Sequence, residues 1–184
     1  MRWLLVFASF GALVLGLFLA ITFLAPTGSD GKQQRTFDAG SKDSFQAGSL
    51  RYFDSQHVYV VRELDGNFKA LYDWDSFAQL QYSHGDLSKT ACRAQEVAQT
   101  FSAYQGDLSA IHQRYVPVPG LENVVLREGC SGSSFDALGR RGFGPSAADL
   151  DRLPVSFDPH GHVIVDLSHR QCQANSPCLE PRPA

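Results

Sequence analysis

A glycine- and serine-rich segment, Glu128 to Asp136, restricts the fold of this chain more than any other feature. It carries one cysteine, Cys130, and it follows the apolar run 124–127, which predicts a strand. Residues 153–157 and 162–167 come after it and flank an Asp-Pro-His-Gly turn, so they predict a final hairpin. The alternating apolar residues of the return strand suit a sheet with one buried face. The segment is therefore expected to be a loop held between short strands.

Further strands are predicted nearer the N-terminus. Residues 58–62 and 68–72 are rich in β-branched and aromatic side chains and flank Asp65-Gly66, a strong hairpin signal because glycine accepts a positive φ. Residues 48–53 predict a first strand. Residues 74–88 show no clear period, and residues 91–111 show only a weak helical spacing. The chain is expected to be all-β.

The segment from Glu128 to Asp136, with Gly144-Pro145 and the final hairpin behind it, resembles the second cluster-binding loop of Rieske iron–sulfur proteins. That loop reads Cys-Pro-Cys-His-Gly-Ser-x-Phe/Tyr-Asp. The resemblance implies a Rieske-like domain of stacked antiparallel β-sheets over residues 46–168. In this family two loops hold a [2Fe–2S] cluster through two cysteines and two histidines, and a disulfide ties the loops together.

The residues of this chain at the ligand positions are different from those of the family. By the resemblance, Cys130 is the bridging cysteine of the second loop, and Cys92, the only cysteine upstream, is its disulfide partner. This register identifies the four degenerate ligand positions as Leu87, Lys89, Glu128 and Ser131. The resemblance therefore implies a domain without its cluster, and no other cofactor or metal is expected.

Other chemistries find less support in the sequence. Cys172 and Cys178 are a second possible disulfide pair. A serine hydrolase site is disfavoured, because no Gly-x-Ser-x-Gly segment surrounds Ser131 or Ser133. Arg140-Arg141 indicates a solvated turn, with docking to a partner as the alternative. A histidine metal site is disfavoured, because alternating residues point to opposite faces; the candidate ligands are His160, His162 and His169.

The N-terminus predicts a membrane anchor. Residues Trp3 to Leu24 carry no charge, and they are long enough to cross a bilayer core of roughly 30 Å. We expect a single transmembrane helix within residues 1–25, a polar linker over 26–45 and an irregular tail over 169–184. Arg2 favours a cytoplasmic N-terminus, which puts the domain on the periplasmic side of the inner membrane; a cleaved signal peptide is the alternative.

Charge and resemblance together suggest a role. A net charge of −3 gives no sign of the basic surface that nucleic-acid binding requires. The resemblance implies a non-catalytic accessory subunit of a membrane-bound electron-transfer complex, next to a cytochrome b-type protein. Two alternatives stay open: a Rieske-type electron carrier with non-standard metal ligands, and a free-standing binding module on the export side. The insertion between Cys92 and Cys130 is expected to form a contact surface.

Overall fold

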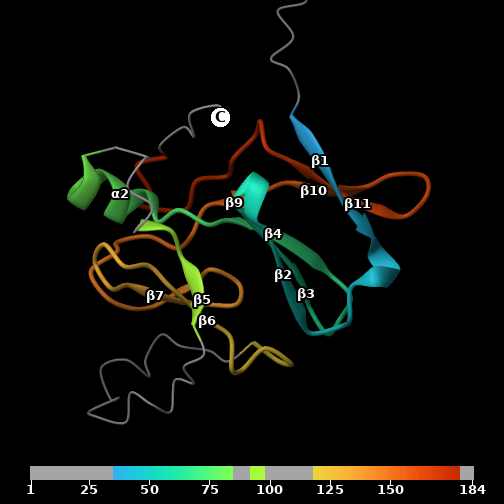
Figure 1. Ribbon diagram of the computed structural model, residues 1–184, viewed down its shortest axis with the longest axis horizontal. Coiled ribbons are helices and arrows are strands. Elements are labelled where there is room, and N and C mark those ends of the chain that lie inside the picture. The colour runs from blue at the N-terminus through green and yellow to red at the C-terminus, as the bar shows by residue number, and fades with distance from the viewer. Residues whose placement is uncertain (1–34, 85–91, 98–117, 179–184) are drawn as a thin grey trace, which may run out of the picture. The chain divides into compact units, whose positions relative to one another are not determined.

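The computed structural model describes residues 35–84, 92–97 and 118–178. They form antiparallel sheets and one α-helix, which confirms the expected β class (Figure 1). No helix within these ranges is long and apolar enough to cross a membrane, and residues 3–24, where the anchor is expected, lie outside them.

The described strands form three sheets. The first has the order β1-β11-β10, with β1 at Thr36–Ser41, β10 at Val155–Phe157 and β11 at His162–Asp166. The second has the order β2-β3-β4-β9, with strands at Ser49–Phe53, Val58–Arg62, Phe68–Tyr72 and Arg152–Leu153. The third has the order β5-β6-β7-β8, with strands at Gln95–Val97, Val125–Arg127, Ser134–Asp136 and Arg141–Phe143. The α-helix, α2, is Ser76–Ser83, and two short 3-10 turns are Lys42–Ser44 and Asp54–Gln56.

The β2-β3-β4-β9 sheet is covered on both faces, which explains why four successive residues of β3 are buried. Tyr59 and Val61 belong to a core cluster that includes Phe135 of the third sheet. Val58 and Val60 belong to a second cluster, with Val163 and Val165 of the first sheet. Since successive side chains of a strand point to opposite faces, the middle sheet is packed between the other two. Figure 1 shows β5, β6 and β7 on one side of this sheet and β1, β10 and β11 on the other.

Several predicted strands are found at the expected places, with one difference. The hairpin around Asp65-Gly66 is formed by β3 and β4, and the run before Glu128 is β6. Residues 153–157, expected as one strand, are divided between two sheets, with Leu153 in β9 and Val155 in β10. Pro154 stands at the crossing, where a residue without a backbone N–H is tolerated.

The N-terminal edge of the domain lies earlier than expected. β1 falls within residues 26–45, where a linker was predicted, and it pairs with β11 from Thr36 to Ser41. Phe45 and Ala39 are buried in the core against Val163 and Val165. The surrounding residues are polar, so the local composition does not predict a strand here. The strand is stabilised by its pairing with β11.

A helix was also missed. Residues 74–88 show no clear period in the sequence, yet α2 occupies Ser76–Ser83. The Asp75 side chain caps it by accepting hydrogen bonds from the N–H groups of Phe77 and Ala78, both at 3.0 Å. In the region of weak helical spacing, residues 95–97 form β5, while residues 98–117 lie outside the described ranges.

Candidate functional site

The loop between β6 and β7 closes on itself through its own backbone. The N–H of Glu128 donates to the carbonyl of Ser133 at 3.1 Å, and the four intervening residues form the tip. Gly132 lies there with φ +79°, a conformation that side chains rarely adopt. These four residues from Gly129 to Gly132 are called the tip loop below.

The Glu128 carboxylate fills the inside of the tip loop. The residue is fully buried, and its oxygens accept hydrogen bonds from the backbone N–H groups of Cys130 at 2.6 Å, Ser131 at 3.0 Å and Ser133 at 2.8 Å. The Ser131 hydroxyl donates to the same carboxylate. A buried anion costs free energy unless several donors surround it, and here the loop backbone supplies them. Glu128 and Ser131, predicted as two degenerate ligand positions, are thus bonded to each other.

A chain of serines connects the tip loop to the helix. The Ser133 hydroxyl is 2.7 Å from the Ser131 hydroxyl and accepts a bond from the Ser146 N–H at 2.9 Å. The Ser146 hydroxyl donates to Asp75 at 3.0 Å. Because Ser133 and Ser146 are both fully buried, these bonds fix three distant segments against one another.

Gly144 permits the close approach of the segment that carries Ser146. A Cβ at this position would come within 3.0 Å of Cα, Cβ and Oγ of Ser133, and φ is +100°. Only glycine therefore fits beside the buried serine.

The Cys92–Cys130 disulfide ties the tip loop to the segment before β5. The sulfur atoms pack in a small cluster with Trp74 and with Ala78 of α2. The N–H of Asp75 donates to the carbonyl of Cys92 at 3.1 Å, so the helix start and the first cysteine are held by the main chain as well. The pairing is the one that the resemblance implied.

A second buried carboxylate, Asp73, lies on the strand side of this cluster. It accepts a hydrogen bond from the Tyr52 hydroxyl at 2.6 Å, and its Oδ2 is 3.5 Å from Nδ1 of His57. Nε2 of His57 lies 3.0 Å from the Arg93 guanidinium. Since arginine can only donate, this contact requires Nε2 to accept, which puts the proton of the neutral ring on Nδ1, facing Asp73.

Burial decides the protonation of these groups. It raises the pKa of Asp73 to about 7, against smaller opposing effects of the Tyr52 hydrogen bond and the Arg93 charge. Burial also raises the pKa of Asp75 to about 6, despite the bonds from Ala78 and Ser146. For His57, burial and then the Arg93 charge lower the pKa. The two aspartates accordingly change charge within the ordinary range of pH.

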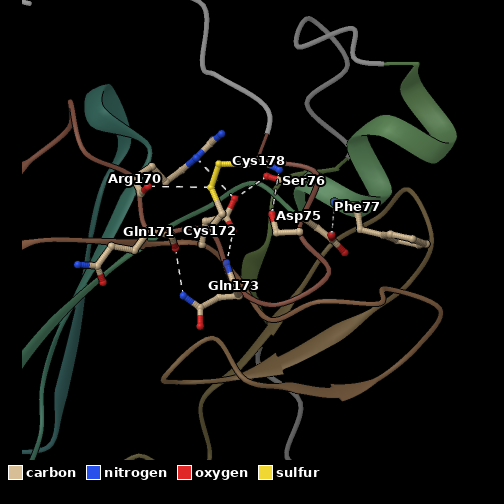
Figure 2. Close-up of polar contacts among 10 residues, drawn as sticks. Asp75, Ser76, Phe77, Arg170, Gln171, Cys172, Gln173 and Cys178 are labelled. Atoms are coloured by element: carbon tan, nitrogen blue, oxygen red, sulfur yellow. Dashed lines mark hydrogen bonds and ion pairs between the residues drawn. A yellow bond between two sulfur atoms is a disulfide. The ribbon is translucent and has the colours of Figure 1, made fainter.

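A further buried carboxylate, Asp151, anchors the C-terminal tail beside the same helix. It accepts hydrogen bonds from the Ser76 hydroxyl at 2.8 Å and from the Gln173 N–H at 3.1 Å, and Nε of Arg170 lies 3.6 Å away. Figure 2 shows Arg170 and Gln173 beside the start of α2. The tail carries the second disulfide, Cys172–Cys178, at the other cysteine pair considered in the sequence.

The remaining candidate residues are placed as follows. Leu87 and Lys89 lie outside the described residues, so the tip is seen with two of its four degenerate positions. Nδ1 of His162 lies 2.7 Å from Oδ2 of Asp38, and Nδ1 of His169 lies 2.7 Å from Oδ2 of Asp166, so these two rings bond to different carboxyl groups.

The arginine pair, expected in a solvated turn, is half-buried after a turn and at the start of β8. Arg140 donates to buried Asp136 at 2.5 Å, and Arg141 donates to the carbonyl of Ser146. Both side chains therefore stabilise the protein's own loops.

Sequence reasoning missed three buried polar residues of this region, Asp73, Asp75 and Ser146. One signal was available for Asp75: an aspartate directly before a short run that begins with Ser76 is a typical helix N-cap. Asp73 and Ser146 gave no comparable signal, because their burial depends on contacts between distant segments.

The tip also brings together three potential metal donors. The Sγ atoms of Cys92 and Cys130 and a carboxylate oxygen of Glu128 lie within 4.8 Å of one another, with both sulfurs joined in the disulfide. This is the one such group of three or more among the residues that the structure describes.

Comparison with known proteins gives a distant structural likeness. No protein-family model and no curated protein matches the sequence. The fold is similar to that of a protein from Mycobacterium tuberculosis whose crystal structure carries the provisional name of small subunit of an NADH-dependent nitrite reductase. The two chains share 15% identity at a TM-score of 0.35, over 72% of this chain and 94% of the other.

Proposed function

We propose that this chain is a cluster-less, Rieske-like accessory subunit of a membrane-bound electron-transfer complex, without enzymatic activity of its own. The observation that carries this proposal is the Glu128 carboxylate. It occupies the inside of the tip loop, where the resembled proteins hold their cluster, and it accepts three backbone N–H groups and the Ser131 hydroxyl.

An iron–sulfur cluster does not suit these residues. Such a cluster takes thiolate or imidazole ligands, whereas Glu128 offers a carboxylate already surrounded by donors and Ser131 offers a hydroxyl bonded to it. Cys130 is joined to Cys92. Leu87 and Lys89 carry an apolar and a cationic side chain. The side chains of the tip loop therefore suit a structural role better than a redox role.

The tip loop is held by bonds within the chain itself, which favours a docking role. Its disulfide, the Ser133–Ser146–Asp75 chain and the Glu128 bonds fix it in one arrangement. A preorganised surface loses little entropy on association. In this proposal residues Trp3 to Leu24 hold the chain in the inner membrane, and the tip faces a cytochrome b-type subunit on the periplasmic side.

Partner identification and iron analysis test the proposal. The full chain is extracted in mild detergent, separated on a native gel, stained for haem and analysed for iron and acid-labile sulfide. We expect migration with haem-containing subunits and no cluster iron assigned to this chain. Stoichiometric iron and sulfide in the chain would favour the electron carrier, and migration alone would favour the free-standing module.

A pair of surface variants tests the docking face. Phe143 lies beside the tip, directly before Gly144, and is 42% exposed, whereas Phe157 of β10 is 54% exposed in a different sheet. Phe143→Glu is expected to abolish comigration with the partner, and Phe157→Glu to preserve it. Equal effects of both variants would contradict docking through the tip.

A further inference from the structure

The Cys92–Cys130 bond lies beside a buried carboxylate that lacks a catalytic or cluster-binding role in the proposed function. The two sulfurs and a Glu128 oxygen lie within 4.8 Å of one another, so small movements of these side chains after the disulfide opens would bring all three to ligand distance from one metal ion, about 2.3 Å for sulfur and about 2.0–2.2 Å for oxygen. Cys92 and Glu128 are fully buried, and Cys130 is half-buried. The donor set of two sulfurs and one carboxylate suits a thiophilic divalent cation, for which thiolate is the preferred ligand.

We propose that reduction of this disulfide converts the tip into a binding site for one thiophilic divalent cation such as Zn²⁺. Cys92, Cys130 and Glu128 are the ligands, and water takes the fourth position. The oxidised chain has no such site, because neither sulfur can become a thiolate. This inference goes beyond the accessory role and does not depend on it.

The chemistry requires a dithiol reductant. Its sulfur attacks Sγ of Cys130, the more exposed of the two, and a mixed disulfide forms as the Cys92–Cys130 bond breaks. The second sulfur of the reductant then displaces Cys130, so the reductant leaves as its own disulfide and its two protons reach the two cysteines. Binding of the cation releases both protons to solvent.

Charged groups of both signs lie near this donor set, since the buried carboxyl of Asp75 is close enough to Glu128 for their charges to interact. Two thiolates and a carboxylate carry three negative charges, of which the cation neutralises two. Arg93 directly follows Cys92, and Nη2 of Arg127 lies 3.6 Å from the position of a Cβ on Gly132 in the tip loop. The N–H groups that now surround Glu128 remain available to orient it, as neighbouring groups commonly do for metal ligands.

Metal titration of a one-disulfide chain tests the proposal. Cys172→Ser/Cys178→Ser in the full chain leaves the central pair as the sole disulfide. The protein is reduced with a dithiol, freed of reductant under argon and titrated with Cd²⁺ or Zn²⁺. We expect one equivalent of Cd²⁺ with a thiolate-to-metal charge-transfer band, one equivalent of Zn²⁺ in competition with a chromophoric chelator, and neither in the oxidised protein.

Two variants identify the ligands. Cys92→Ser is expected to lose the charge-transfer band and the tight equivalent, and Glu128→Gln to keep the band but bind at least about tenfold more weakly. The proposal is overturned if the reduced one-disulfide chain binds no more tightly than its Cys92→Ser counterpart. Unfolding on reduction, followed by circular dichroism, also overturns it unless one equivalent of metal restores the folded spectrum.

Discussion

At the scale of single residues, a carboxylate stabilises the tip loop from within. Three backbone N–H groups of this region donate to the Glu128 carboxylate, so their hydrogen bonds are satisfied within the chain. Buried N–H groups left without an acceptor are costly. The loop therefore depends on the charge and acceptor oxygens of one side chain.

Glu128→Gln tests that dependence. A glutamine of the same shape brings an NH₂ group against backbone N–H donors, so we expect a loss of roughly 2 kcal/mol in the free energy of unfolding. Urea denaturation at pH 7 measures it. Glu96→Gln, at an exposed position of β5, is the control and should change stability by less than about 0.5 kcal/mol. Equal stability of the two variants would show that the carboxylate is dispensable.

Gly144 offers a second prediction at this scale. Gly144→Ala introduces both positive-φ strain and a collision with Ser133, so we expect a loss of roughly 3 kcal/mol. Gly66→Ala is the matched control: Gly66 has φ +88° but nothing within 4 Å of an added Cβ. That variant should lose only about 1 kcal/mol. The difference between the two losses of unfolding free energy, measured by urea or thermal denaturation, gives the contribution of packing. Equal losses in both variants would contradict the close fit at Ser133.

At the scale of elements, the helix α2 is where distant segments converge. Its cap, Asp75, receives a bond from Ser146, and its first residue, Ser76, donates to Asp151, which also binds the tail. The helix is only two turns long and would be marginal in isolation. Its position is therefore set by these side chains and by the disulfide behind Ala78.

Asp151→Asn is expected to loosen the tail selectively. In the aspartate, one carboxylate oxygen accepts from the Gln173 N–H and the other faces the Ser76 hydroxyl and Arg170. Asparagine has only one accepting oxygen, so it loses the contacts of one of these two positions. We expect amide exchange at Gln173 to accelerate by about tenfold, with no change in β11. Hydrogen exchange read by NMR gives the comparison, and Asp65→Asn in the β3–β4 turn serves as control. Uniform acceleration across the domain would instead indicate global destabilisation.

The elements predictable from sequence were those with local signals. The β3–β4 hairpin carries strong strand composition and an Asp-Gly turn, and β6 ends at a glycine-rich loop. β1 and α2 were missed because their residues are mostly polar and their stability comes from pairing with β11 or packing on a disulfide. At the tip, the cysteine partners followed from a resemblance. The inward turn of Glu128 did not, since a charged residue in a glycine-rich loop normally faces solvent.

At the scale of the whole molecule, buried aspartates dominate the response to pH. Asp73 has a pKa raised to about 7 and Asp75 a pKa raised to about 6, against an ordinary value of 3.8. Between pH 4 and 7 the folded chain therefore binds more protons than the unfolded chain, and stability falls as pH rises. The lowered pKa of His57 opposes this trend, and the raised pKa of His162 adds to it.

We expect Asp73 and Asp75 together to lower the free energy of unfolding by roughly 5 kcal/mol between pH 4 and pH 7. Asp73→Asn should remove most of the decrease, because the group no longer ionises. Asp65→Asn is the control, because that carboxyl is exposed in the β3–β4 turn and bonds to Asn67 within the same turn. A series of urea transitions across this range measures the slope. Stability that rises toward neutral pH in the unmodified chain would refute the assignment.

The pairing of β1 with β11 has a mechanical consequence for the domain. The N–H of Arg35 donates to the Ser168 hydroxyl, and the N–H of Leu167 donates to the carbonyl of Arg35, each at 2.7 Å. The residue before β1 and the residues after β11 are thus hydrogen-bonded to each other. A pull on Arg35 away from the sheet would first break this pair of bonds and then the bonds of β1 in turn, because β1 is an edge strand. Opening β1 in this way leaves β11 paired with β10.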